Sequence, residues 1–161
     1  MPDTGADPRV SSGLMLATYV VGALGIAIGF STVNSDPPSL SWACLLAVGG
    51  GGLLSCVRHS IFHRSDTARM GWDLGQRNNF QIEVGLANLA WGVVGIASVV
   101  LGWGMGAQAA TFLTFGVYLL SVAGMQLVSP GGPRRSPGPL IGLASFGLML
   151  CVLGVMGMRV A

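Results

Sequence analysis

The residues best suited to chemistry lie between positions 58 and 83, a segment that holds seven of the fourteen charged side chains and both histidines. His59 and His63 are four residues apart and Asp66 follows three later, so one continuous helix would place all three on one side. That spacing suits a metal ion. A complete site needs a further ligand, and Asp73 or Glu83 would have to fold back to supply it. We therefore predict that the protein has no metal site. If one existed, its candidate ligands would be His59, His63 and Asp66.

The same segment has a second interpretation, as a polar helix end at the level of the lipid headgroups. Arg58 and Arg64 would face phosphates, and an interfacial loop would bring Arg69 and Arg77 to anionic lipid beside Trp72. This interpretation predicts anchoring to the bilayer and implies no substrate. We favour it over the metal site.

The sequence contains no motif that names a reaction. We predict no catalytic residue and no cofactor, and we lean against an enzyme. The three cysteines, at positions 44, 56 and 151, lie in apolar stretches and form no C-x-x-C pair, which is typical of small packed side chains. Thr111, Thr114, Tyr118 and Ser121 form a hydroxyl stripe, which would either line a polar cavity or bond within the helices.

The elements that position these residues are apolar and long. Hydrophobic residues make up 52% of the 161-residue chain and charged residues 9%, against about 25% charged in soluble domains. Five stretches without Asp, Glu, Lys or Arg have nearly the length that a helix needs to cross a bilayer. We predict an all-α membrane bundle with five transmembrane helices at about residues 13–33, 40–57, 84–103, 107–128 and 140–158.

Arginine placement predicts the orientation. Seven of the eight arginines lie before the first span or in the loops after the second and fourth spans, and Arg159 is the exception. We predict an N-terminus inside and a C-terminus outside, in a multi-pass protein of the bacterial cytoplasmic (inner) membrane. The chain is one membrane domain, 1–161, with a polar tail at 1–12 and a charged cytoplasmic loop at 58–83. A net charge of +2 excludes a nucleic-acid binder.

Small residues predict where the helices touch, because helix association in lipid depends on close packing. On the first span they share one face, which includes the Gly25-x-x-x-Gly29 motif. On the third span Gln81, Gly85, Asn88, Gly92 and Gly95 share a face. The run of four glycines at 49–52 in the second span predicts either a close helix crossing or a hinge.

One string in this region resembles a known family. Gly71-Trp72, a short spacer, then Phe80-Gln81-x-Glu83-Val84-Gly85-x-Ala87-Asn88-Leu89 and Gly92 is similar to the pattern of a domain-of-unknown-function family of small bacterial membrane proteins. The resemblance implies a multi-span membrane fold and no known activity. In physical terms the string is a helix start, with Asn78 or Asn79 as the cap.

Three functions fit these patterns. The preferred one is a non-enzymatic accessory subunit or self-associating bundle, whose partners are the lipid bilayer and either further copies or a larger membrane complex. The second is a binder or carrier of a small apolar or lipid-like molecule. The third is a membrane enzyme with its site in the loop 58–83.

Overall fold

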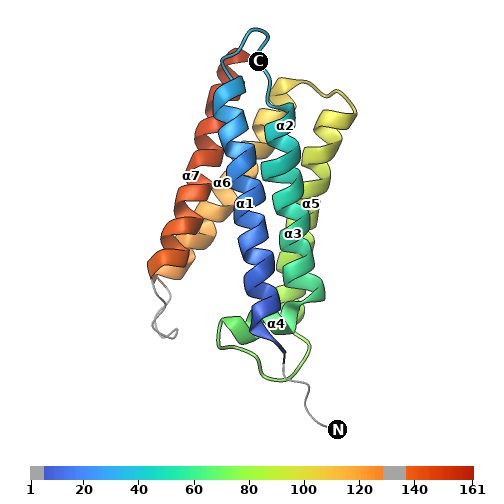
Figure 1. The fold of residues 1–161 in the computed structure, drawn as a ribbon, viewed down its shortest axis with the longest axis vertical. Coiled ribbons are helices and arrows are strands. Elements are labelled where there is room, and N and C mark those ends of the chain that lie inside the picture. The colour runs from blue at the N-terminus through green and yellow to red at the C-terminus, as the bar shows by residue number, and fades with distance from the viewer. Residues whose placement is uncertain (1–5, 129–136) are drawn as a thin grey trace.

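The computed structural model describes residues 6–128 and 137–161, and all regular structure within them is helical. Long helical rods run side by side, and the short helix α4 lies across one end of them (Figure 1). The described residues contain five helices long and apolar enough to cross a membrane. The predicted all-α class and the predicted number of spans are therefore confirmed.

The second rod, Ser41–Ile61, combines α-helical and wider π-helical turns, and α4 follows it. The bounds are α1 Pro8–Thr32, α2 Ser41–Ala43, η1 Cys44–Gly50, α3 Gly51–Cys56, η2 Val57–Ile61, α4 His63–Arg69, α5 Asn79–Val100, α6 Met105–Val128 and α7 Pro137–Val160. We name the two ends of the bundle after the short helices that lie there, the α4 end and the α2 end. Helix α1 begins at the α4 end and α7 finishes at the α2 end (Figure 1).

Most helices are longer than the predicted spans, and the extra turns lie mainly at the α4 end. Helix α1 begins at Pro8, within the predicted tail, with the Asp7 side chain accepting a hydrogen bond from the backbone of Arg9. Helix α5 begins at Asn79, where the Asn78 side chain caps the Gln81 amide. The apolar stretch shows which part of a helix would lie in the hydrocarbon core of a bilayer, whereas the capping side chains determine where the helix begins.

The glycine run at 49–52 is helical throughout and lies where two helices cross at close range. A Cβ at Gly52 would lie 2.7 Å from the carbonyl oxygen of Asn88 and from backbone atoms of Gly92. A Cβ at Gly25 would lie 2.5 Å from the backbone nitrogen of Ala47. The small-residue faces of α1 and α5 are thus occupied from within the chain, that of α5 by the second rod and that of α1 by the second rod and α7.

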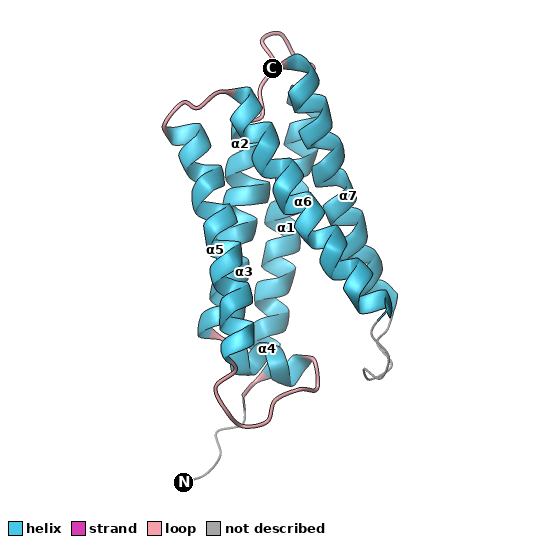
Figure 2. Cartoon of the chain, turned by 180° about the vertical axis from the view of Figure 1, so that it is seen from behind, coloured by secondary structure: helices cyan, strands magenta, loops and turns pink. Residues whose placement is uncertain are grey.

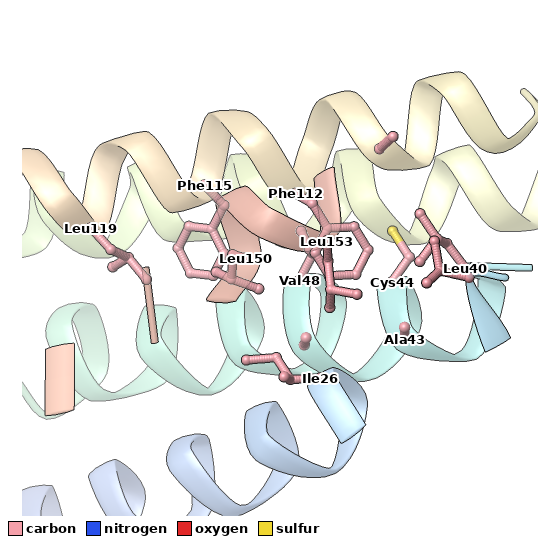
Figure 3. Close-up of a cluster of buried hydrophobic side chains, with 13 residues drawn as sticks. Ile26, Leu40, Ala43, Cys44, Val48, Phe112, Phe115, Leu119, Leu150 and Leu153 are labelled. Carbon is pink, nitrogen blue, oxygen red and sulfur yellow. The ribbon is translucent and has the colours of Figure 1, made fainter. Parts of the chain in front are cut away.

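The apolar core lies in the half of the bundle nearer the α2 end, where α6 and α7 pack onto α1 and η1 (Figure 3). Its buried members are Ile26, Val33, Leu40, Ala43, Cys44, Ala47, Val48, Ala109, Phe112, Phe115, Leu119, Leu150 and Leu153. Towards the α4 end the α6–α7 hairpin diverges from the other three rods (Figure 2). The bundle is therefore closed at one end and splayed at the other.

Candidate functional site

A break in the helix after the second rod places one carboxylate inside the bundle. Phe62 leaves helical geometry, with φ −100° and ψ 32°, and α4 restarts at His63 in a new direction. This turn carries Asp66 under the bundle, where its side chain is 0% exposed. The continuous helix that would align His59, His63 and Asp66 does not form, because the chain bends at Phe62 between the two histidines.

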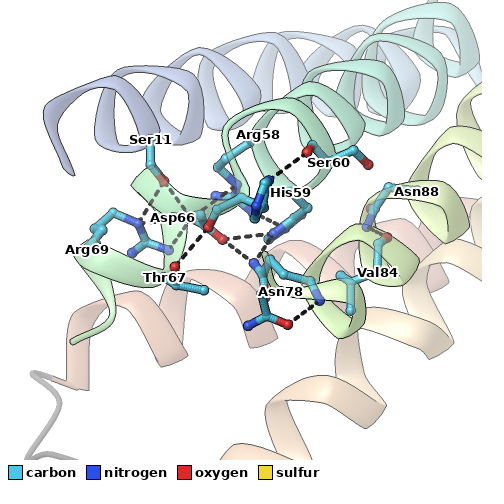
Figure 4. A network of polar contacts seen from close by, with 12 residues as sticks. Ser11, Arg58, His59, Ser60, Asp66, Thr67, Arg69, Asn78, Val84 and Asn88 are labelled. Atoms are coloured by element: carbon cyan, nitrogen blue, oxygen red, sulfur yellow. Dashed lines mark hydrogen bonds and ion pairs between the residues drawn. The ribbon is translucent and has the colours of Figure 1, made fainter. Parts of the chain in front are cut away.

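Asp66 is surrounded by donors from four elements (Figure 4). Ser11 on α1 donates to Oδ1 at 2.5 Å, and Arg69 on α4 donates to the same oxygen through Nη2 at 3.0 Å. Gln81 on α5 donates to Oδ2. The Nδ1 atom of His59 on η2 lies 2.8 Å from Oδ2. The cluster therefore ties together helices that are far apart in the sequence.

Arg58 completes the cluster and determines the proton position on His59. One Arg58 nitrogen, Nη2, lies 2.7 Å from His59 Nε2. A guanidinium group can only donate, so Nε2 accepts from Arg58 and the proton of the neutral ring is on Nδ1, which faces Asp66 Oδ2 at 2.8 Å and the side-chain amide nitrogen of Gln81 at 2.6 Å. His59 is then neutral. Arg58 Nε lies 3.8 Å from Asp66 Oδ1, an ion pair without a hydrogen bond.

Asp66 is ionised at every physiological pH. Its burial would by itself raise the pKa of the carboxyl group, but the His59 hydrogen bond and the positive charge of Arg58 outweigh burial and hold that pKa well below the usual range. The cluster therefore contains one carboxylate, two guanidinium groups and a neutral imidazole. Its net charge is positive by one unit.

A cavity of about 580 Å³ adjoins this cluster, between the diverging α6–α7 hairpin and the other rods. Arg58, His59 and Arg69 form its charged and polar wall. Further polar groups come from Ser55, Asn88 and Tyr118, and the apolar wall includes Met15, Leu119, Val122, Leu140 and Leu143. The cavity thus has a cationic end and an apolar body.

The remaining members of the predicted metal and headgroup sets lie apart from the cluster. His63 faces the carbonyl oxygen of Ser60, with Nδ1 at 3.1 Å. Within residues 6–128 and 137–161 no three His, Cys, Asp or Glu side chains converge as metal ligands. Arg64 donates to Asp73 at 3.3 Å, and the exposed Arg77 lines a second cavity of about 390 Å³. Arg58 and Arg69 turn inward toward Asp66, and their contact with lipid headgroups stays a prediction.

The residues of the family string divide into a buried and an exposed set. Gln81, Gly85, Asn88 and Gly92 are buried along one face of α5. Asn88 donates to the carbonyl oxygen of Val84 on its own helix at 2.7 Å.

The exposed set comprises Gly71, Trp72, Phe80 and Glu83. Gly71 adopts a φ of 76°, in the left-handed region that favours glycine. No ion pair joins Glu83 to another described residue, Arg77 included.

Two members of the hydroxyl stripe on α6 bond to their own helix and face outward. Thr114 donates to the Ala110 carbonyl oxygen and Ser121 to that of Val117. Tyr118 is the one member of the stripe that lines the large cavity.

Sequence reasoning did not predict that Ser11 and Gln81 would meet Asp66. The available signal was that each is a polar residue near the α4 end of a small-residue packing face.

Comparison with known proteins places the chain in one family. No curated protein and no solved structure matches it. A family model described as a family of unknown function, DUF6790, matches residues 11–129. This match covers every residue of the Asp66 cluster and the string that carried the resemblance. The chain is a member of the DUF6790 family.

Proposed function

We propose that this protein is a non-enzymatic membrane protein that binds a lipid-like amphiphile in the cavity beside α6 and α7. The observation that carries the proposal is the cavity itself, with its cationic end and apolar body. Its volume of about 580 Å³ lies within the range of roughly 300–1,000 Å³ usual for ligand pockets. An amphiphile matches both ends of such a cavity at once.

The proposed location is a bacterial cytoplasmic membrane, with the α4 end toward the cytoplasm. Five apolar helices support a membrane protein. The concentration of seven arginines in the segments of one side supports the orientation. In that orientation the polar cluster lies near the inner headgroup layer and the cavity extends from it into the bilayer.

The geometry supports binding better than catalysis in the segment 58–83. Asp66 accepts hydrogen bonds from Ser11, Arg69 and Gln81 as well as His59. A carboxylate saturated in this way, with a lowered pKa, is a poor general base. The neutral His59 is also engaged at both ring nitrogens.

An accessory subunit of a larger assembly or a self-associating bundle is the function preferred from the sequence. The geometry weakens self-association through the Gly25-x-x-x-Gly29 motif, because Ala43, Ala47 and Leu153 of the same chain already occupy that face. Stable co-purification of a second protein in mild detergent would support the accessory role instead.

A lipid-binding measurement with a filled cavity tests the proposal. Radiolabelled dioleoylglycerol and dioleoyl phosphatidylglycerol are offered separately to detergent-solubilised protein in a scintillation proximity assay. Val122 lines the cavity, so Val122→Trp should occupy it and lower binding by roughly tenfold or more, the equivalent of about 1.4 kcal/mol. The matched control is Val117→Trp on the exposed face of the same helix, which should bind as wild type does.

Circular dichroism and thermal unfolding establish that both variants fold. Failure of the wild-type protein to bind either lipid above the micelle background contradicts the proposal. Equal binding by the two tryptophan variants contradicts it as well, since lipid would then attach outside the cavity.

A further inference from the structure

The buried cluster contains more positive than negative charge. Arg58 and Arg69 face a single carboxylate, Asp66, and the hydrogen-bond pattern leaves His59 neutral. Asp73, another carboxylate at this end, pairs with Arg64 outside the cluster. Buried charge is costly unless it is compensated. The cluster therefore lacks one negative charge.

Both arginines are positioned to receive that charge from the cavity. Arg58 and Arg69 line it, while Asp66 contacts both from the opposite side. The Arg58 side chain is 14% exposed, and its Nε is buried without a hydrogen-bond partner in the structure. Asp66 thus orients two guanidinium groups on one wall of the cavity. Guanidinium groups are the preferred partners of phosphate and carboxylate oxygens.

Neutral hydrogen-bonding groups lie in the same cavity beside Arg58. Ser55, Asn88 and Tyr118 line the wall contributed by the second rod, α5 and α6. Beyond them the lining is mainly apolar, through Leu119, Val122 and Leu143, and it also includes Gln126. An oxyanion at the arginines would therefore have hydroxyl and amide groups nearby, with an apolar surface for an attached chain.

We infer that the ligand carries an oxyanionic headgroup, a phosphate or a carboxylate, which binds Arg58 and Arg69 with its acyl chain against α6 and α7. This inference rests on the proposed function and adds the charge and the position of the headgroup. It identifies Arg58 and Arg69 as binding residues and Asp66 as a positioning residue. The bound anion would bring the cluster to neutrality.

The test compares two lipids that differ only in the headgroup. Wild-type protein should bind dioleoyl phosphatidylglycerol more tightly than uncharged dioleoylglycerol by roughly tenfold, because a charge-assisted hydrogen bond contributes about that factor. Arg58→Gln should remove most of this preference while dioleoylglycerol binding persists. The matched control Arg9→Gln removes the same charge from an exposed position at the same end and should leave the preference unchanged.

A further arm separates a lipid headgroup from a free anion. Inorganic phosphate is added in place of lipid, at constant ionic strength against chloride, and thermal unfolding is measured. Stabilisation by phosphate that Arg58→Gln abolishes, without any preference for phosphatidylglycerol, would assign the site to a free anion and overturn the lipid headgroup.

The remaining outcomes are distinct for the two proposals. Equal binding of the two lipids by wild type overturns the anionic headgroup and leaves the amphiphile proposal standing. Absence of binding by either lipid overturns the amphiphile proposal itself. The wild-type comparison requires no variant, so the inference remains testable if Arg58→Gln does not fold.

Discussion

Asp66 is a residue whose burial is unfavourable unless its neighbours compensate it. Transfer of a lone carboxylate into a protein interior costs several kcal/mol even after relaxation. Here Ser11, His59, Arg69 and Gln81 all direct donors at its two oxygens. The carboxylate also stabilises two arginines that would otherwise repel each other. The single side chain therefore joins α1, η2, α4 and α5 at the α4 end.

Replacement of Asp66 should be strongly destabilising. Asp66→Asn keeps the shape but leaves Arg58 and Arg69 without their counter-charge, so the free energy of unfolding should fall by about 3–5 kcal/mol. The control is Asp73→Asn, which breaks the partly exposed pair with Arg64 and should cost about 0–1 kcal/mol. Unfolding in mixed detergent micelles measures both. Equal losses would contradict the structural role of Asp66.

The pH dependence of this effect follows from the direction of the Asp66 pKa shift. Its folded-state pKa lies below the ordinary value of 3.8, so its stabilising contribution is complete above that value and is lost as the pH falls further. The difference in free energy of unfolding between wild type and Asp66→Asn should therefore be the same at pH 7 and at pH 5, because Asp66 is ionised at both values. A difference that shrinks within that interval would show an elevated pKa instead.

At the scale of elements, the second rod is held by glycine contacts with α1 and α5. Gly52 and Gly92 meet backbone to backbone, which allows the two helices to approach more closely than larger side chains permit. The π-helical turns of η1 lie in the same rod, beside the close contact of Gly25 with Ala47. Such turns widen the helix locally and shift the register of its contact faces.

A methyl group at the crossing should therefore disrupt packing. Gly52→Ala would place Cβ 2.7 Å from the Asn88 carbonyl oxygen, and overpacking of this kind costs about 1–3 kcal/mol. Gly13→Ala is the matched control, because Gly13 is also helical and has no atom within 4 Å of the added Cβ. Thermal unfolding in detergent should show a clear loss for the first and none for the second. A neutral Gly52→Ala would mean that the rods do not cross there.

At the scale of the whole molecule, the bundle is tight at the α2 end and open at the α4 end. Helices α5 and α6 are joined by a short turn in which Gly102 and Gly104 have positive φ values, yet they separate away from that turn (Figure 2). The α6–α7 hairpin packs as a pair through close contacts such as Gly116 with Gly147. The splay between this hairpin and the other rods creates the cavity.

The orientation of this asymmetric bundle can be tested by cysteine labelling on intact cells, in a background without the three native cysteines. Single cysteines at Ser35 and Trp103, exposed at the α2 end, should react with an impermeant thiol reagent. A cysteine at Leu74, which is 86% exposed in the loop before α5, should react only after permeabilisation. Labelling of position 74 from outside would reverse the predicted orientation and place the cationic cavity in the outer leaflet.

The sequence alone determined the features that depend on local pattern. The number of spans follows from stretches of apolar residues, because a chain in lipid must satisfy its backbone hydrogen bonds within each helix. The Asn78 cap of α5 and the glycine turn after it are equally local. The polar and small residues that share one face of α5 could be recognised from helical periodicity, which fixes their relative directions.

Only the tertiary structure decided which polar groups meet. Ser11 and Asp66 are 55 residues apart, and no sequence periodicity relates α1 to α4. The bend at Phe62 also interrupts the helical periodicity between His59 and Asp66. The inward direction of Arg58 and Arg69 was likewise not predictable, because a headgroup and a buried carboxylate attract an arginine equally well. The cavity depends on the angle between the α6–α7 hairpin and the other rods, and that angle results from side-chain packing over the whole bundle, which no single segment encodes.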